Sequence, residues 1–136
     1  MKLIFLSNDF YNDYGGHPEI LKKHNRPYAC LAVKIDGKIF AIPFRHNITH
    51  NHAFITFDKC GLDYTKAVPI LKKEYISSAP VIIDQKEYNL IKSKEKIIIK
   101  GLSNYISLYK KALKYSTSPH YKNIIQYSAL NAFQIK

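Results

Sequence analysis

Residues 26–44 read RPYACLAVKIDGKIFAIPF, in which two mostly apolar stretches are joined by Asp36-Gly37. Asp-Gly between apolar runs is typical of a two-residue turn in which both residues have positive φ. The sequence therefore predicts a β-hairpin with strands at Arg26–Ile35 and Lys38–Phe44. Pro43 has no backbone N–H to donate, so it is expected at an edge, at a bulge or at the end of its strand.

Short apolar runs predict further strands on both sides of this hairpin. They lie at Lys2–Leu6, at Ala53–Phe57 and near Val68–Leu71. A fourth run, KIIIK at residues 96–100, is typical of a short buried strand. Most of the expected strands therefore precede residue 72.

The second half otherwise has the period of helices. Asp84 and Glu87 have the spacing of a capping box, which predicts a helix that ends near Lys94. Apolar residues on one face predict a helix over residues 102–114, with lysines on the opposite side. Residues 120–133 predict a last helix.

Two segments near the start carry weaker signals. Residues 8–16 are rich in Asn, Asp and Gly and are expected to form turns, and residues 19–23 are expected to form one helical turn. No repeat or linker divides the chain. We therefore expect one α+β domain over residues 1–136, with an antiparallel sheet and mostly C-terminal helices packed on it.

The composition excludes several classes of protein. The chain has 136 residues, of which 46% are hydrophobic, too many for a wholly disordered chain. No apolar run approaches the roughly 20 residues that span a bilayer, and the apolar start is too short for a signal peptide. Cys30 and Cys60 are too few for a disulfide framework or a cysteine metal set, so a cytoplasmic protein is expected.

The charge points to a polyanionic partner. The chain carries 21 Lys and Arg against 10 Asp and Glu, a net charge of +11. Residues 69–136 hold 12 of the basic residues and 4 of the acidic ones. Lysines interleaved with 11 tyrosines suit contacts with phosphates and bases of RNA. The plainer alternative is a soluble protein with a basic surface.

The segment RHNITHNH, residues 45–52, has the residue types that metal-independent RNA cleavage needs. A base must take the 2′-OH proton, an acid must protonate the leaving 5′-oxygen, and a cation must stabilise the phosphorane. Imidazole suits the first two roles and the guanidinium of Arg45 suits the third. The expected catalytic residues are Arg45, His46, Asn47, Thr49 and His50.

The same segment has other interpretations. Loop histidines are often solvated, Arg45 could simply pair with Asp63, and three histidines could bind zinc. Zinc ranks low because no cysteine stands beside them at ligand spacing and no paired carboxylates accompany them. We therefore expect no metal and no cofactor.

Five motifs occur together in order: FLSNDFY at 5–11, NRPY at 25–28, the Asp-Gly hairpin, IPFRHNITHNHAF at 42–54 and CGLDYTKAV at 60–68. In this arrangement the chain resembles the toxins of type III toxin–antitoxin systems, the ToxN/AbiQ superfamily, and most of all its TenpN and CptN branches. The resemblance covers at least residues 1–70.

The resemblance implies a fold and a function. Such toxins have a twisted antiparallel sheet similar to the MazF/Kid barrel, decorated by helices. They are metal-independent endoribonucleases that leave 2′,3′-cyclic phosphate and 5′-OH ends. Each is inhibited by a small pseudoknot RNA antitoxin, whose precursor it trims and with which it forms a ring-like protein–RNA assembly. The free toxin slows growth, often as phage defence.

The expected RNA contacts lie outside the catalytic set. Asp63 is expected to orient Arg45 or a histidine. The alternative function is a non-catalytic RNA-binding module, which the same charge and tyrosines would serve. The residues expected to bind RNA are Tyr11, Arg26, Tyr28, Lys34, His52, Lys94, Lys96, Lys110, Lys111 and Lys114.

Overall fold

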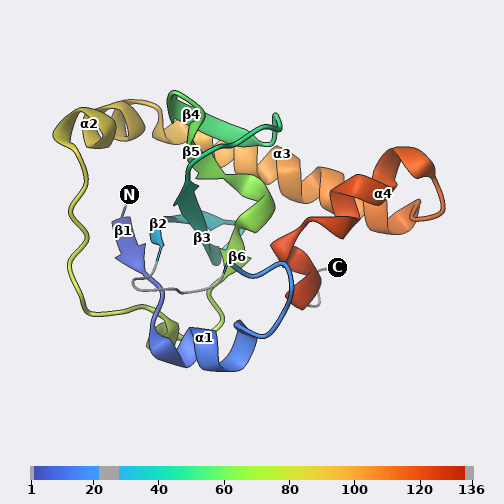
Figure 1. Cartoon of the computed structure of the whole chain (residues 1–136), viewed down its shortest axis with the longest axis horizontal. Coiled ribbons are helices and arrows are strands. Elements are labelled where there is room, and N and C mark those ends of the chain that lie inside the picture. Colours follow the sequence, from blue (N-terminus) through green and yellow to red (C-terminus); the bar gives the residue numbers. More distant parts are fainter. Residues whose placement is uncertain (1, 22–27, 134–136) are drawn as a thin grey trace.

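The predicted hairpin lies at the centre of the fold in the computed structural model, which describes residues 2–21 and 28–133 (Figure 1). Its strands are β2 (Ala29–Ile35) and β3 (Lys38–Arg45), which pair in antiparallel register from Cys30–Pro43 to Ile35–Lys38. Asp36 and Gly37 have φ angles of 50° and 80°, as the predicted turn requires. The hairpin is therefore confirmed over its described residues.

The sheet has six strands, and all of its pairs are antiparallel. The order is β1-β2-β3-β5-β4, with β6 paired to β3, so β1 and β4 form the edges of an open sheet. The predicted α+β class is thus confirmed, whereas the strand β5 was not predicted. The remaining strands are β1 (Lys2–Phe5), β4 (Ala53–Phe57), β5 (Cys60–Asp63) and β6 (Val68–Pro69).

Pro43 lies where β3 changes partners. On the edge away from β2, Phe40 and Ala41 pair with β6, whereas Phe44 and Arg45 pair with β5. Pro43 falls between these two segments, close to the end of the strand. The missing N–H is therefore tolerated near the strand end, as expected.

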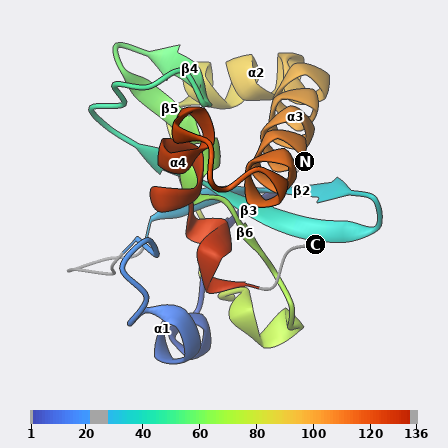
Figure 2. The same ribbon diagram turned by 90° about the vertical axis from the view of Figure 1, so that its right-hand side faces the viewer.

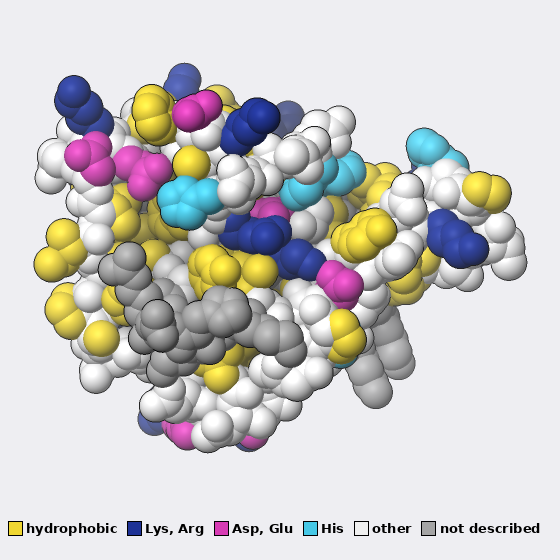
Figure 3. Space-filling model, in the orientation of Figure 1, with side chains coloured by type: hydrophobic (Ala, Val, Ile, Leu, Met, Phe, Trp, Pro, Cys, Tyr) yellow, Lys and Arg dark blue, Asp and Glu magenta, His cyan; other side chains and the backbone are white. Residues whose placement is uncertain are grey.

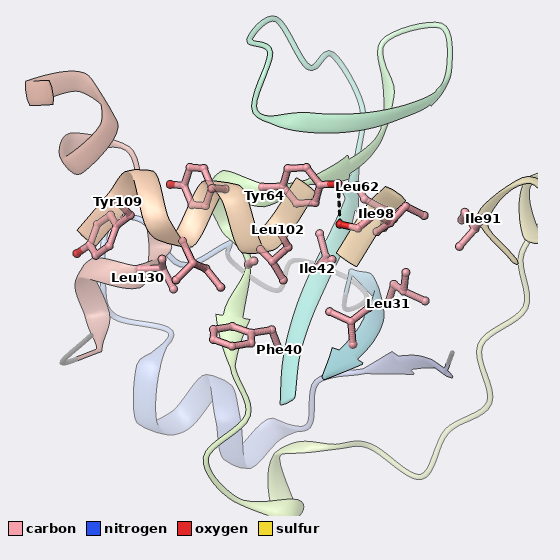
Figure 4. Close-up of a cluster of buried hydrophobic side chains, with 14 residues drawn as sticks. Leu31, Phe40, Ile42, Leu62, Tyr64, Ile91, Ile98, Leu102, Tyr109 and Leu130 are labelled. Atoms are coloured by element: carbon pink, nitrogen blue, oxygen red, sulfur yellow. Dashed lines mark hydrogen bonds between the residues drawn. The ribbon is translucent and has the colours of Figure 1, made fainter. Parts of the chain in front are cut away.

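Alternate residues of β2 and β3 face two separate hydrophobic clusters. Leu31 and Ile42 belong to the cluster packed against α3 (Glu95–Lys114), which Figure 4 shows in close-up. Cys30 and Ala41 belong to the other cluster, which also contains residues of α1 (Asn8–Tyr14). Helices therefore cover both faces of the central hairpin, with α3 on one side and α1 on the other (Figures 1 and 2).

The prediction of a strand at residues 96–100 is wrong, because these residues form the first part of α3. Ile98 is fully buried four residues before the buried Leu102, whereas Ile97 is 57% exposed. This is helical spacing, and burial of the helix face outweighs the strand preference of three successive isoleucines. The expected face over residues 102–114 is confirmed as part of the same helix.

The prediction of turns at residues 8–16 is also wrong, because most of these residues form α1. The hydroxyl of Ser7 accepts a hydrogen bond from the N–H of Phe10 and caps the helix. Phe10 is 1% exposed and packs against the ring of Tyr75. The helical turn expected at residues 19–23 is not seen at Glu19 and Ile20, and residues 22 and 23 lie outside the described part.

The remaining helices follow the expected order. The carboxylate of Asp84 accepts from the N–H groups of Lys86 and Glu87, so the cap of α2 (Gln85–Ser93) is confirmed. The expected last helix is divided into α4 (Pro119–Gln126) and a 3₁₀ turn, η3 (Ala129–Ala132). Figure 1 shows α4 beside the C-terminal end of α3, away from the sheet.

Candidate functional site

The polar segment predicted at residues 45–52 connects two strands, but Arg45 is the last residue of β3, so the loop that joins β3 to β4 is residues 46–52. Its backbone is fixed to the β4–β5 hairpin, because the N–H of the buried Ile48 donates to the carbonyl of Lys59 over 2.9 Å. Asn47 has a φ of 56°, which reverses the chain before Ile48. The loop is therefore anchored by one apolar residue while its polar neighbours stay at the surface.

The side chain of Asp63 is the centre of the site, and it is fully buried. Its Oδ2 accepts from Nη1 of Arg45 over 2.9 Å, and its Oδ1 lies 3.2 Å from Nε2 of His50. Oδ1 also accepts from the N–H and the hydroxyl of Thr65 over 2.9 and 2.6 Å. The expected pairing of Asp63 with Arg45 and with a histidine is thus present.

His50 is held through both nitrogens of its ring. Nε2 faces Asp63, and Nδ1 accepts from the backbone N–H of His52 over 3.0 Å. This arrangement places the proton of the neutral ring on Nε2. His50 therefore links the loop to the buried carboxylate, and neither nitrogen points to a substrate without a rearrangement.

His52 has a fixed backbone and a ring without hydrogen bonds to the described residues. Its N–H donates to His50, and its carbonyl accepts from the N–H of Tyr64 over 3.1 Å. The ring centroid lies 6.0 Å from that of His50 and 5.7 Å from that of Tyr105. Burial and the neighbouring His50 lower the pKa of His52 below its ordinary value of 6.5, while Asp63 opposes them. The ring is therefore neutral near pH 7 and can accept a proton.

Two expected catalytic residues stand apart from this group. Nδ1 of His46 lies 3.1 Å from Sγ of Cys60, and Asn47 is exposed at the turn of the loop. Thr49, by contrast, lines a pocket together with His50 and His52. The structure thus gathers Arg45, His50 and His52 around Asp63, places Thr49 in the pocket beside the two histidines, and places His46 next to Cys60.

Two pockets adjoin His52, and both also include Asn51 and Tyr105. One of about 370 Å³ lies between the loop and α4 and is lined by Asn123 and Tyr127. The other, of about 360 Å³, lies between β4 and α3 and is lined by Phe54 and Asn104. These polar and aromatic residues of the C-terminal helices were not predicted as site residues.

Tyr105 supplies a rigid wall to both pockets. Its hydroxyl donates to Oγ of the buried Ser128 over 2.8 Å. Burial raises the pKa of Tyr105 to about 12, so the phenol stays protonated at physiological pH. From the sequence, Tyr105 was predicted only as part of the apolar face of the helix. Its hydroxyl is the one feature that distinguishes it from the aliphatic residues of that face.

The expected lysines of α3 form an exposed row on the side opposite Leu102 and Tyr109. From Lys96 to Lys114 this row extends about 27 Å, at 1.5 Å per residue. The exposed lysines expected to bind RNA are Lys94, Lys96, Lys110, Lys111 and Lys114.

Figure 3 shows a second basic feature of the surface. On the face seen in Figure 1, histidine side chains lie on both sides of a group of Lys and Arg side chains.

The other expected RNA contacts do not join the histidine loop. Tyr11 and Tyr28 are half-buried and line a small cavity of about 20 Å³ beside α1, where burial raises the pKa of the Tyr11 phenol well above its ordinary value. Lys34 pairs with Ile39 near the hairpin turn, at the end of β3 opposite Arg45. Arg26 lies outside the described residues. RNA binding by these residues stays a prediction.

Within residues 2–21 and 28–133, no three His, Cys, Asp or Glu side chains are placed to hold a metal ion. The described helices include none that is both long and apolar enough to cross a membrane. Comparisons of the chain with models of protein families, with curated proteins and with solved structures found no match.

Proposed function

We propose that this protein is a metal-independent endoribonuclease. The observation that carries the proposal is the group formed by Arg45, His50 and His52 around the buried Asp63, beside two pockets. It combines a guanidinium, which can stabilise negative charge, with two imidazoles, which can serve as base and acid, around one buried carboxylate. These are the groups that transesterification of RNA requires.

The proposed reaction needs a base, an acid and a cation that act together. The 2′-oxygen bonds to phosphorus while its proton passes to a neutral imidazole. The P–O5′ bond breaks, and the 5′-oxygen takes a proton from the protonated ring of a second histidine of the loop. The guanidinium of Arg45, with a side chain that is 33% exposed, stabilises the added negative charge of the phosphorane. The products are a 2′,3′-cyclic phosphate and a 5′-OH.

We further propose that the protein is the toxin of a type III toxin–antitoxin system. The ordered motifs of residues 1–70 and the open antiparallel sheet with helices support this, and the finer fold would be a partial barrel similar to MazF/Kid. Its inhibitor would be a small pseudoknot RNA that closes a ring-like assembly in the cytoplasm. The lysine row of α3 supports a polyanionic partner of this kind.

The chemistry is tested by incubating purified protein with RNA in EDTA and identifying the product ends. We expect cyclic phosphate and 5′-OH ends, lost in Arg45→Ala and retained in His120→Ala, which changes an exposed histidine on α4. RNA that is bound but never cut would favour the non-catalytic RNA-binding module. Activity lost in chelator and restored by zinc would favour the metal interpretation.

The toxin assignment has its own test. The protein is purified from its native host at moderate salt, and its nucleic acid is sequenced. We expect one discrete small RNA with the repeat sequence of its own locus. A mixture of unrelated cellular RNAs would contradict the antitoxin while leaving the nuclease proposal standing.

A further inference from the structure

The two pockets beside His52 adjoin each other, and together they are called the groove below. They share Asn51, His52 and Tyr105, and their volumes are nearly equal, about 370 and 360 Å³. Hereafter the pocket between the loop and α4 is the α4 pocket, and the one between β4 and α3 is the α3 pocket. Each has the size of a site for a small organic group.

The lining of each pocket suits a nucleobase, which has apolar faces and polar edges. In the α4 pocket, Tyr127 is 54% exposed and lies with Ile124 beside the amide of Asn123. In the α3 pocket, Phe54 and Leu108 accompany the amide of Asn104. Both pockets thus offer apolar surface for a base and an amide that can both donate and accept hydrogen bonds.

Charge distinguishes this groove from the other large pockets of the described chain. Neither the α4 pocket nor the α3 pocket is lined by an Asp or Glu of the described residues. In both of the other pockets the acids outnumber the lysines. The pocket beside α2 includes Asp84 and Glu87 with Lys86, and the pocket beside α1 includes Asp9, Asp13 and Glu74 with Lys72. A phosphodiester would be repelled at those two pockets and not at the groove.

We propose that this groove binds two consecutive unpaired nucleosides of an RNA chain, one base in each pocket, with the linking phosphate beside His52. The inference rests on the proposed nuclease function and extends it to the form of the substrate. Single-stranded RNA fits because its unstacked bases can enter separate pockets, whereas bases in a duplex cannot.

The position of His52 gives it a role in the reaction. Its backbone is held by His50 and Tyr64 while its ring nitrogens have no partner among the described residues. Lying between the two bases, the ring takes the 2′-OH proton of the first nucleoside as the 2′-oxygen bonds to phosphorus. The bond from phosphorus to the 5′-oxygen of the second nucleoside breaks, and this oxygen takes a proton from the protonated ring of a second histidine of the loop. His52 is thus a catalytic residue of the groove.

The binding is tested with the full chain and a deoxydinucleotide, which lacks the attacking 2′-OH. In an NMR titration we expect the side-chain amides of Asn104 and Asn123 to shift together. Tyr127→Ala should weaken binding about tenfold, because one base loses its aromatic stacking partner. Leu108→Ala should weaken it several-fold, because the other base loses apolar contact. Asn12→Ala, which changes an exposed residue of α1, is the matched control and should bind as the wild type does.

The outcomes separate the inference from the proposed function. If the deoxydinucleotide shifts both amides and ribose substrates are never cut, the groove stands and the nuclease function fails. If RNA is cut but Tyr127→Ala and Leu108→Ala bind the deoxydinucleotide as tightly as Asn12→Ala does, the inference is overturned and the nuclease function stands. Shifts at Asn123 alone would also overturn it, because the second base would lie elsewhere.

Discussion

Nε2 of His50 lies 3.2 Å from Oδ1 of Asp63, a carboxylate with no exposed surface. The other oxygen of the same carboxylate accepts from Arg45 over 2.9 Å. A buried anion of this kind is stabilised only while its partners remain. One acidic residue in β5 therefore sets the positions of both the guanidinium and the imidazole of the loop.

Replacing Asp63 should destabilise the protein strongly. In Asp63→Ala, Arg45 and His50 lose their anion and Thr65 loses its acceptor, so we expect the free energy of unfolding to fall by about 2–3 kcal/mol. Urea denaturation measures it. Thr65→Val, which removes one hydroxyl donor, should cost about 1 kcal/mol. Equal losses for the two variants would mean that Asp63 does not hold the site together.

Acidification should destabilise the protein through His52. Its pKa is lowered in the folded state, so below pH 6.5 the unfolded chain binds more protons than the folded one. The free energy of unfolding should thus fall as the pH drops through about 6.5 toward the folded pKa, and the loss then levels off. His50, Asp63 and Tyr105 are the titratable groups around the ring.

Thermal unfolding between pH 7.5 and pH 5 measures this effect. The unfolding temperature should fall less steeply with decreasing pH in His52→Gln than in the wild type. In His120→Gln it should fall as steeply as in the wild type. The same slope in all three proteins would show that another group causes the acid sensitivity.

Loss of the charged and proton-transferring groups should abolish toxicity without abolishing RNA binding. We expect Arg45→Ala and His52→Ala to permit normal growth on expression while each still binds the antitoxin RNA. Growth curves at matched expression and a filter-binding assay measure the two properties. Full toxicity of both variants would mean that the catalytic group is misassigned.

The lysine row should determine the salt dependence of RNA binding. Each phosphate contact with single-stranded RNA adds about 0.7 to the slope of log K against log salt, so Lys111→Gln with Lys114→Gln should reduce it by about 1.4. Lys72→Gln with Lys73→Gln removes two exposed lysines near η2 (Lys73–Tyr75) and is the matched control. Equal slopes for the two double variants would place the RNA elsewhere.

A side chain at Gly101 should disturb the contact between α3 and the sheet. A Cβ there would overlap the hydroxyl of the buried Tyr64, which donates to the carbonyl of Ile98 over 3.0 Å (Figure 4). We expect Gly101→Ala to lower the free energy of unfolding by about 1–3 kcal/mol. Gly16→Ala, where the added Cβ meets nothing within 4 Å, should change it much less. Similar stabilities would show that Tyr64 moves aside without cost.

The parts of the fold that could be predicted are those determined by residues close together in the sequence. Asp36-Gly37 determines the hairpin and Asp84 determines the start of α2, because each acts within a few residues. The strand predicted at residues 96–100 was wrong as a prediction, because this segment is helical only through burial against the sheet. The strand β5 was missed because it is four residues long and contains Gly61.

The candidate site was predictable to a similar extent. Arg45, Thr49 and His50 were identified because they lie close together in one polar segment of the sequence, and Asp63 because it was the acid expected to pair with Arg45. The roles of Tyr105 and Asn123 were not predictable, because these residues reach the loop only when α3 and α4 pack beside it. Contacts across such separations depend on tertiary packing.

The bond between Tyr105 and Ser128 has a consequence for synthesis on the ribosome. The sheet and the histidine loop emerge early, but the wall that Tyr105 forms is anchored by a residue made 23 positions later. A nascent chain can thus pair its strands before its groove is complete. A nuclease built in this way would stay harmless to its own messenger RNA until translation has passed Ser128.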